Sequence, residues 1–251
     1  MAEGKLFIIG AGPGDPELLT IKASRCLEVC DVLFHDASIA EEILCFAPEG
    51  TEKISLFNES DGETISKAAM DEIIKAVKAG KTVGVLLEGD PFIFGVGAEV
   101  ARKAVEAGCK FELVPGITSA SAAAVYAGIP LTYRGYASTL AFAIGHSSLN
   151  RRYTDIDWPR VAIGMQTLIF FINEDSLSMV IEKLLANGRD PRTPAAIVSS
   201  GTRKDQSTIA GNLGELRSMT EDERQIKKIP MPAVLIVGDV VGLRQELKWF
   251  E

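Results

Sequence analysis

The chain has 251 residues, enough for one large domain or two smaller ones that each bury a hydrophobic core. Hydrophobic residues make up 47% of it, which excludes an intrinsically disordered chain. Its apolar runs are shorter than the roughly 18–20 residues that span a bilayer. The net charge of −8 and the lack of a basic cluster argue against nucleic-acid binding, because phosphate contacts need clustered lysine and arginine.

The spacing of the cysteines bears on metal binding, and the first residues of the chain bear on its cellular location. The four cysteines, at positions 26, 30, 45 and 109, form no Cys-x-x-Cys pair, so a structural zinc site is not expected. Cys26 and Cys30 are four residues apart, which places them on one face of a predicted helix as buried thiols. The chain moves into a strand without a charged leader and cleavage site, which predicts a cytoplasmic protein.

Apolar runs alternate with amphipathic stretches along most of the chain, which predicts alternating strands and helices. The predicted strands are 5–10, 31–36, 81–90, 111–116, 138–144, 167–172, 195–198 and 233–237. The predicted helices are one from Asp15 to about residue 29, 63–79, one that follows the turn 115–120 and includes the small residues 121–124, 175–186 and 211–219. This alternation predicts an α/β protein with a largely parallel sheet in its first half. We place a boundary between domains 1–116 and 117–251.

The turn Gly10–Asp15, GAGPGD, follows a predicted strand and opens a predicted helix, the setting of a dinucleotide-binding turn. Asp36, at the end of the next strand, stands where a ribose-binding acid would lie. However, Asp15 replaces the third glycine of that fingerprint, and its carboxylate would repel a pyrophosphate. Pro16 also removes a backbone donor. The turn therefore suits an uncharged or zwitterionic ligand, with an NAD site and a turn without a ligand as alternatives.

Two further glycine turns follow predicted strands. The turn 88–95, EGDPFIFG, lies at the carboxyl end of a strand, where ligands of open α/β sheets bind. Gly89 and Asp90 are therefore expected to line a cofactor site, with Asp90 as a helix cap being the alternative. The turn 115–120, PGITSA, leads into a helix of small residues. Such a helix either packs closely or leaves room for a flat ligand.

Several segments, taken in order, resemble the tetrapyrrole (corrin/porphyrin) methylase family, the class III S-adenosylmethionine-dependent methyltransferases. The resemblance covers nearly the whole chain and rests on GAGPGDPELLT, GDPFIFG, VPGITSASAAAVYAGIPLTYRGYAS, TLIFFI, RDPRTPAAIVSSGT and PAVLIVGDVVGLRQELKWF. It implies two α/β domains with S-adenosylmethionine in the cleft between them, and a homodimer. Within the family, the chain is most similar to members that methylate uroporphyrinogen III.

The resemblance also implies a reaction and a set of site residues. The expected reaction is C-methylation of a tetrapyrrole, first of all uroporphyrinogen III at C2 and C7 to precorrin-2, in sirohaem or cobalamin biosynthesis, with S-adenosylhomocysteine as the other product. Asp36 matches the active-site aspartate, a general base or an acceptor of a pyrrole N–H; a helix cap or a turn acid is its alternative. Arg134 matches a substrate-binding position. The positions that match cofactor-lining residues are Pro13, Gly89, Asp90, Ile93, Thr118, Ser119, Ile172, Gly201 and Ala233.

Three cations of the family pattern are missing from this chain. Val96 and Ala37 stand where the family has arginine, and Asn58 lies near the position of a lysine. Because the substrate is a polyanion, these losses predict weaker or redirected substrate binding unless Arg134 and the arginines at 151–152 compensate. The alternatives are therefore a methylase of another precorrin, a homologue that binds cofactor without this activity, and an NAD-dependent oxidoreductase.

Overall fold

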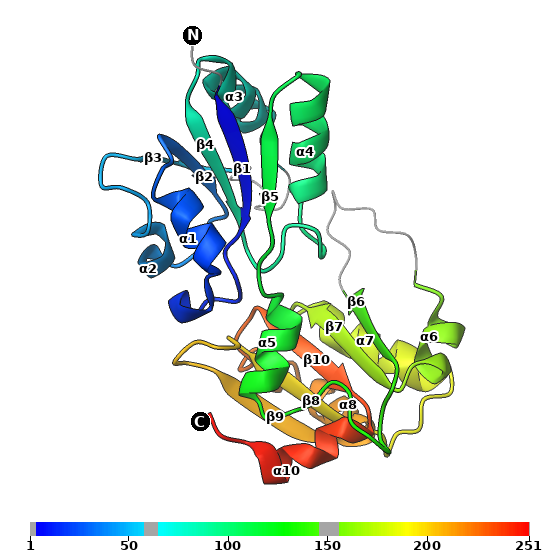
Figure 1. Cartoon of the computed structure of the whole chain (residues 1–251). Helices are drawn as coiled ribbons and strands as arrows, with labels where there is room; N and C mark the ends of the chain where they lie inside the picture. Colours follow the sequence, from blue (N-terminus) through cyan, green and yellow to red (C-terminus); the bar gives the residue numbers. More distant parts are fainter. Residues whose placement is uncertain (1–3, 58–64, 146–155, 251) are drawn as a thin grey trace. The chain divides into compact units, whose positions relative to one another are not determined.

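The protein is described by a computed structural model that covers residues 4–57, 65–145 and 156–250. The chain divides into two compact units, Met1–Ser119 and Ala120–Glu251. Each unit has a five-stranded sheet with helices packed on it (Figure 1). The predicted α/β fold is therefore confirmed. The division falls after Ser119, whereas the sequence places it after Gly116.

The sheet of the first unit is built from parallel strands in the order β3-β2-β4-β1-β5. Its strands are β1 (Lys5–Gly10), β2 (Val32–His35), β3 (Glu52–Ser55), β4 (Thr82–Leu87) and β5 (Phe111–Val114). The inner strands β1 and β4 are buried at all but their first residue, which explains their continuous apolar runs. The edge strand β3 is mostly exposed and lacks such a run, so the sequence did not predict it.

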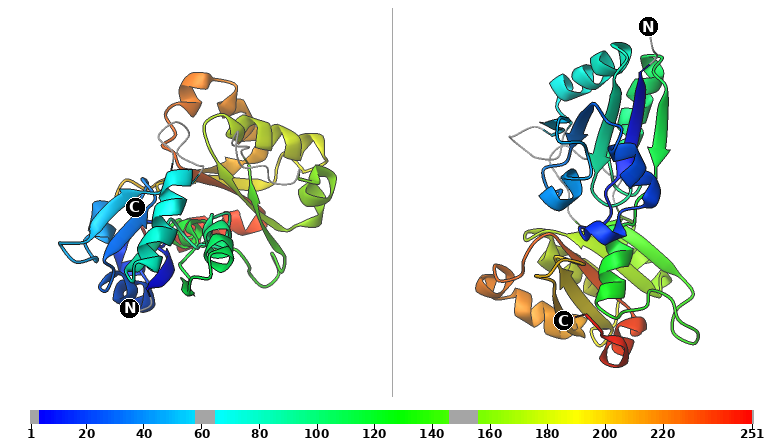
Figure 2. Two further views of the ribbon diagram at one scale, coloured as in Figure 1. Left: turned by 90° about the horizontal axis from the view of Figure 1, so that it is seen from above. Right: turned by 60° about the vertical axis from the view of Figure 1, so that its left-hand side comes forward.

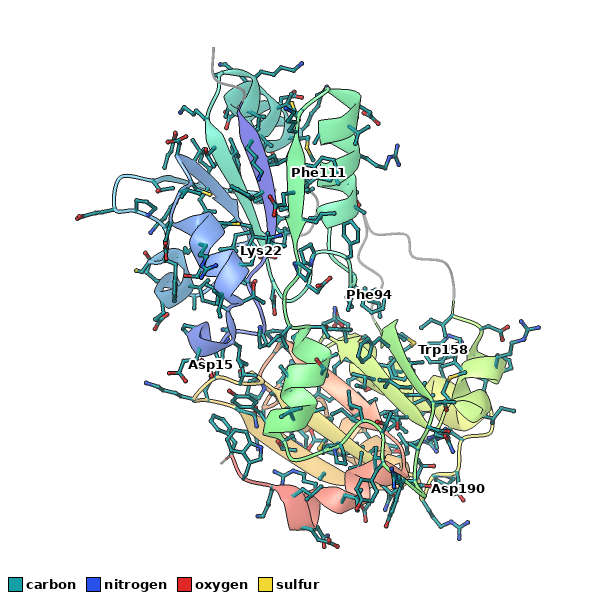
Figure 3. All side chains as sticks on the ribbon, in the orientation of Figure 1. Asp15, Lys22, Phe94, Phe111, Trp158 and Asp190 are labelled. Atoms are coloured by element: carbon teal, nitrogen blue, oxygen red, sulfur yellow. The ribbon has the colours of Figure 1, made fainter. Side chains whose placement is uncertain are left out.

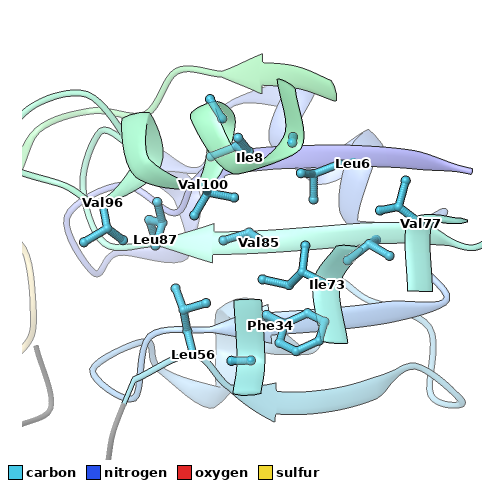
Figure 4. Packing of buried hydrophobic residues seen from close by; sticks show 14 of the residues in the cluster. Leu6, Ile8, Phe34, Leu56, Ile73, Val77, Val85, Leu87, Val96 and Val100 are labelled. Atoms are coloured by element: carbon cyan, nitrogen blue, oxygen red, sulfur yellow. The ribbon is translucent and has the colours of Figure 1, made fainter. Parts of the chain in front are cut away.

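Helices cover both faces of this sheet (Figure 2). The helices of the unit are the 3-10 helix η1 (Pro16–Leu18), α1 (Ile21–Leu27), α2 (Glu41–Leu44), α3 (Lys67–Lys78) and α4 (Gly97–Glu106). On one face, Ile73 and Val77 of α3 and Val100 of α4 pack against strand residues such as Leu6 and Val85 (Figure 4). On the other face, α1 and α2 pack against β1, β2 and β4.

The helix predicted from Asp15 to residue 29 is two shorter elements. The Asp15 carboxylate accepts a hydrogen bond from the Glu17 N–H (2.9 Å) and caps η1 only. The extended backbone of Thr20 then interrupts the helix, and its hydroxyl accepts from the Ala23 N–H (3.1 Å) to start α1. The helix predicted over 63–79 is shorter as well and begins after Ser66.

Cys26 and Cys30 are buried, as predicted, but they do not share a helix. Because α1 ends at Leu27, Cys30 lies in the following turn, where its thiol donates to the Cys26 carbonyl (3.2 Å). Burial raises the pKa of the Cys30 thiol to about 12, so this thiol stays protonated and unreactive at neutral pH.

The sheet of the second unit has the order β6-β7-β10-β8-β9 and is mixed, because β6 and β7 are parallel and the other described pairs are antiparallel. Its strands are β6 (Leu140–Ile144), β7 (Thr167–Ile172), β8 (Pro194–Ser199), β9 (Ser207–Asn212) and β10 (Ala233–Val237). The exposed edge strand β9 was not predicted. Asn212 and Glu215 form a capping box that starts the next helix after this strand, so the helix predicted from residue 211 begins two residues later.

Helices pack on both faces of this sheet as well. The helices of the unit are α5 (Ser119–Tyr126), α6 (Trp158–Gly164), α7 (Ser176–Ala186), α8 (Leu213–Thr220), α9 (Glu223–Ile226), the 3-10 helix η2 (Asp239–Leu243) and α10 (Arg244–Leu247). Small residues of α5 and the valines of η2 pack on one face, and α7 and α8 pack on the other. Trp158, at the start of α6, stacks on Phe170 of β7 with ring centroids 5.7 Å apart (Figure 3).

The half-buried guanidinium of Arg189 closes the end of α6. Its Nη1 donates to the carbonyls of Ala162 (3.0 Å) and Met165 (2.7 Å), and its Nη2 donates to the carbonyl of Gln166 (3.1 Å). The last carbonyls of a helix have no partner within the helix, so Arg189 replaces a cap. Burial lowers the pKa of Arg189, and the Asp239 carboxylate opposes that shift.

Replacing Arg189 with lysine is expected to lower the free energy of unfolding by about 1–3 kcal/mol, because one ammonium cannot reproduce a fork of bonds to three carbonyls. Urea denaturation followed by circular dichroism measures the change. Arg192→Lys is the matched control, since that exposed guanidinium pairs, among the described residues, with the nearby carboxylate of Asp190. Equal urea midpoints for the two variants would show that Arg189 has no special role.

The carboxylate of Glu112 lies between two lysines on the first unit. Its Oε1 is 2.5 Å from Nζ of Lys22, and its Oε2 is 2.5 Å from Nζ of Lys5. Hydrogen bonds from Lys22 and then Lys5 lower the pKa of Glu112 to about 2. We therefore expect the carboxyl carbon of Glu112 to titrate near pH 2 in NMR, and Lys22→Gln to raise the midpoint.

The pKa of Glu112 is lower in the folded chain than the value of about 4.3 expected in the unfolded chain. Its contribution to stability is therefore present above about pH 4.3 and is lost as the pH falls toward 2. A midpoint near 4 in the wild-type chain would mean that the two lysines do not hold this carboxylate in solution.

Candidate functional site

The turns after β1, β4 and β5 meet at one edge of the first sheet, because the carboxyl ends of parallel strands share an edge. Gly12 and Gly89 form an isolated bridge between two of these turns. The Gly89 N–H donates to the Gly12 carbonyl (2.9 Å), and the Gly12 N–H donates to the Gly89 carbonyl (3.2 Å). These hydrogen bonds join the turns after β1 and β4 within the first unit.

Two of the glycines at this edge, Gly10 and Gly116, leave no room for a side chain. A Cβ on Gly10 would lie 2.6 Å from the Gly116 nitrogen and 2.7 Å from the Gly89 carbonyl oxygen. A Cβ on Gly116 would overlap the same Gly89 oxygen. The turns therefore approach one another through bare backbone.

Asp90 ties the second turn to the third. Its Oδ1 accepts from the Phe92 N–H (2.9 Å), and its Oδ2 accepts from the Gly116 N–H (3.1 Å). The helix-cap alternative for Asp90 is wrong, because α4 begins only at Gly97, with the apolar Val96 at its N-cap. Asp90 is instead a clip between two turns that are 26 residues apart in sequence.

Cofactor-matching residues of the first unit gather around this clip. A Cβ on Gly89 would lie 3.6 Å from the Ser119 nitrogen and 3.7 Å from the Thr118 Cα, at ordinary contact distance. Pro13 is buried in the first turn, and Ile93 is half-buried in the second. The structure thus brings Gly89, Asp90, Thr118 and Ser119 together within one unit.

Left-handed backbone occurs at non-glycine residues in two of the motifs. Phe94 of the second turn has φ 54° (Figure 3), and Ser200 and Thr202, on either side of Gly201, have φ 48° and 72°. Such residues cost about 1–2 kcal/mol each and concentrate at functional sites. These positions therefore support a functional role for the GDPFIFG and SSGT segments.

The cofactor-matching residues of the second unit lie at one edge of its sheet. Ala233 begins β10 and lies opposite Ile172 on one side and Ser199 on the other. Gly201 follows β8, and a Cβ there would lie 2.6 Å from the Ala123 side chain of α5. Ile172 and Ala233 are therefore neighbours, and Gly201 comes two residues after Ser199, which pairs with Ala233 on its other side.

Arg134 lies at the opposite end of β7 from Ile172. Its loop is closed by hydrogen bonds between Tyr133 and Ala137, and it lines a surface pocket. The loop leads to Ser138, whose N–H donates to the Gln166 side chain just before β7 begins (2.7 Å). Within the second unit, the structure does not bring Arg134 to the edge that holds Ile172.

Asp36 follows β2, where its N–H donates to the Leu86 carbonyl of β4 (3.1 Å). Its Oδ1 accepts from both the N–H (3.0 Å) and the hydroxyl (3.1 Å) of Ser38. The helix-cap alternative is wrong, because α2 begins at Glu41 after Ala40, whereas the bond from the Ser38 N–H is the one expected of a turn acid. Among the described residues, none hydrogen-bonds Oδ2, so this oxygen is available to a ligand.

Sequence reasoning missed one contact beside Asp36. The Ser38 hydroxyl also lies 3.0 Å from Oε2 of Glu88, the residue before the Gly-Asp-Pro turn. The only sequence signal was a serine two residues after an aspartate, which is typical of a turn in which the aspartate accepts from the serine N–H. The partner Glu88 was hidden because it comes from another strand.

The positions of the missing cations differ in their surroundings. Val96 is 5% exposed and packs in the core beside Leu87 and Val100 (Figure 4). Restoring arginine there would force a guanidinium into an apolar cluster, so Val96→Arg is unsuited to test for lost activity. Ala37 is exposed. Asn58 and the arginines at 151–152 lie outside the described residues.

In residues 4–57, 65–145 and 156–250, histidine, cysteine and acidic side chains form no group of three or more that could hold a metal ion. Within those ranges, none of the helices has the length and apolar character needed to cross a membrane. At the first turn, the carboxylate of Asp15 (labelled in Figure 3) already accepts from the Glu17 N–H, so this N–H is not available to a dinucleotide phosphate.

Comparison with known proteins identifies the family. The sequence model of the family Tetrapyrrole (Corrin/Porphyrin) Methylases matches residues 5–217 of this chain. The chain is 40% identical over 249 residues to Siroheme synthase 1 of Klebsiella pneumoniae, and the aligned region covers 99% of this chain and 51% of that protein. It is 39% identical over 250 residues to the siroheme synthase of Nitrosospira multiformis, with 99% and 52% covered. The chain thus spans about half the length of the curated relatives it matches.

Two solved structures match this chain over nearly their whole length. The crystal structure of uroporphyrin-III-C-methyltransferase from Thermus thermophilus has a TM-score of 0.79 and 32% identity, covering 99% of this chain and 98% of that one. A structure of the Thermus thermophilus enzyme complexed with S-adenosylhomocysteine has a TM-score of 0.78 and 31% identity, with 95% and 93% covered. The fold expected of a class III methyltransferase is therefore confirmed, and the chain belongs to the tetrapyrrole (corrin/porphyrin) methylase family.

Proposed function

We propose that this protein is an S-adenosylmethionine-dependent C-methyltransferase that acts on a tetrapyrrole. The proposed substrate is uroporphyrinogen III, methylated at C2 and C7 to precorrin-2 on the route to sirohaem or cobalamin. The observation that carries the proposal is the full-length match, at 32% identity, to the uroporphyrin-III-C-methyltransferase of Thermus thermophilus. The siroheme synthases that match 99% of this chain point to the same chemistry.

The glycine edge, which is the end of the first sheet where Gly10, Gly12, Gly89 and Gly116 meet, suits the chemistry of the cofactor. S-adenosylmethionine supplies, when bound, an electrophilic methyl group on a sulfonium, and it carries no phosphate. Gly89 faces Thr118 and Ser119 without a Cβ, so a ligand there meets backbone donors and acceptors and small side chains. We propose that Pro13, Asp90 and Ile93 complete this contact surface. Ile172, Gly201 and Ala233 are proposed as the contacts from the second unit.

Asp36 is proposed to handle the proton that the substrate releases. The Ser38 N–H and hydroxyl both donate to Oδ1, which fixes the orientation of the carboxylate. Oδ2 can then accept a pyrrole N–H or a ring proton. A positioned base of this kind accelerates a reaction by about 10²–10⁴-fold. Because the cofactor is already activated, orienting the reacting atoms is the other main task of the protein.

A related precorrin is the second candidate substrate. Val96 occupies a core position that the family motif gives to arginine, so this chain lacks a cation there for a substrate carboxylate. The lost cation favours a tetrapyrrole with fewer or differently placed carboxylates. Arg134 is proposed to meet one of those carboxylates.

We also propose a homodimer in the cytoplasm. The homodimer rests on the family resemblance alone. The cytoplasmic location is supported by the four cysteines, which are all free thiols, as is usual in a reducing compartment.

The proposed function predicts both binding and transfer. Titration calorimetry is expected to show S-adenosylhomocysteine binding, with NAD giving no heat. Incubation with S-adenosylmethionine and uroporphyrinogen III is expected to yield a methylated isobacteriochlorin-type chromophore, followed by visible absorbance. A chain that binds the cofactor product yet changes neither uroporphyrinogen III nor other precorrins would contradict the activity.

Two alanine variants test the glycine edge in the same assay. Gly89→Ala and Gly108→Ala both force alanine into left-handed backbone, at φ 63° and 68°. Only the Gly89 side chain would enter the space next to Ser119, since nothing lies within 4 Å at Gly108. Both variants are expected to lose similar stability of about 1–2 kcal/mol. Only Gly89→Ala should weaken S-adenosylhomocysteine binding, by about tenfold, and equal affinities would argue against this edge as the binding surface.

Asp36→Asn is expected to lower kcat about 100-fold or more, because the amide cannot accept a proton. The affinity for S-adenosylhomocysteine should stay within about twofold. Asp31→Asn is the matched control. Asp31 lies just before β2, at the other end of that strand from Asp36, and its carboxylate accepts from the Thr82 N–H (2.7 Å). If initial rates fall equally in both variants, or in neither, Asp36 is not the base.

A further inference from the structure

The Ser38 hydroxyl lies between two carboxyl groups that come from neighbouring strands. Its Oγ is 3.1 Å from Oδ1 of Asp36 and 3.0 Å from Oε2 of Glu88. The strands β2 and β4 pair in parallel, with His35 opposite Leu86. Asp36 and Glu88 follow these strands, so the register brings both carboxyl groups to adjacent points of the sheet edge.

A serine hydroxyl has one hydrogen, and an ionised carboxylate only accepts hydrogen bonds. With both carboxylates ionised, the Ser38 hydroxyl can therefore donate fully to Asp36 or to Glu88, but not to both. The Ser38 N–H also donates to Oδ1 of Asp36 (3.0 Å), so that oxygen keeps one donor in either arrangement. Of the described residues, Asp36 and Glu88 are thus competing acceptors for the one hydroxyl hydrogen.

We propose that Ser38 and Glu88 are positioning residues for Asp36, an inference that rests on the proposed function. While Asp36 is ionised, the hydroxyl donates to Oδ1 and holds the carboxylate. When Oδ2 has taken the proton from the substrate, Asp36 becomes neutral and Glu88 becomes the stronger acceptor. The hydroxyl then turns toward Glu88. No covalent bond of Ser38 breaks, and the substrate proton remains on Oδ2 of Asp36.

Steady-state kinetics of the full chain separate this role from a merely structural one. Ser38→Ala is expected to lower kcat about tenfold, because it removes a hydrogen bond to a charged group. KM for both substrates should stay within about twofold. Ser38→Thr keeps the hydroxyl and should restore most of the rate. Glu88→Gln should lower kcat about threefold, because a neutral amide oxygen accepts more weakly than a carboxylate.

The chain offers a matched control pair on α1. The Ser24 hydroxyl donates to the Glu28 carboxylate (3.3 Å) at the end of that helix, outside the glycine turns. Ser24→Ala and Glu28→Gln are therefore expected to leave kcat unchanged. A fall in kcat as large as that in Ser38→Ala would assign the effect to general destabilisation and overturn the inference.

A second readout does not depend on turnover. The ¹³C resonance of the Asp36 carboxyl, assigned by its loss in Asp36→Asn, should move in Ser38→Ala and Glu88→Gln and stay in place in the control pair. An unmoved resonance, or an active wild type whose kcat is indifferent to Ser38→Ala, overturns the inference alone. A wild type that methylates no tetrapyrrole overturns the proposed function, and with it this role for Ser38, even where the resonance moves.

Discussion

The close approach of three glycine backbones is the constraint on which the first unit depends. Gly10, Gly89 and Gly116 lie so near one another that a Cβ on Gly10 or Gly116 would overlap a neighbouring backbone. The bridge between Gly12 and Gly89 and the Asp90 clip to Gly116 hold the three turns in this arrangement. Because the turns meet through backbone, they present N–H and carbonyl groups to a ligand, and the Asp90 carboxylate accepts from the Phe92 and Gly116 N–H groups. This surface suits a cofactor without phosphate.

The same edge of the first sheet also carries two carboxyl groups, and one of them, Glu88, is the first residue of the second glycine turn. Asp36 and Glu88 follow β2 and β4, and the Ser38 hydroxyl joins them. Val96 belongs to the core beneath α4, so a cation is replaced there by packing. Under the proposed function, the glycine edge holds the cofactor while the end of β2 handles the proton. Substrate recognition then depends on residues that differ from the family pattern, which is why cofactor class follows more directly from this chain than substrate identity.

Burial explains which elements could be predicted from the sequence. The strands Lys5–Gly10, Thr167–Ile172 and Ala233–Val237 have their predicted bounds, because they are covered on both faces and read as continuous apolar runs. The strands β3 and β9 lie at exposed sheet edges and have no such pattern. At the site, the glycine turns were predictable from their residues. The Asp90–Gly116 and Ser38–Glu88 contacts were not, because they depend on strand order, which local sequence does not specify.

Arg134 shows why a motif match transfers a residue type more readily than a role. Its segment is part of the same long match as Thr118 and Ser119. Yet its loop lies at the end of β7 where Thr167 begins the strand, and Ile172 lies at the other end. A strand of six residues separates the two by about 17 Å, more than an arginine side chain reaches. Within the second unit, Arg134 therefore cannot act on the same ligand atoms as Ile172. A substrate role for Arg134 requires a large ligand, and a macrocycle with peripheral carboxylates has that size.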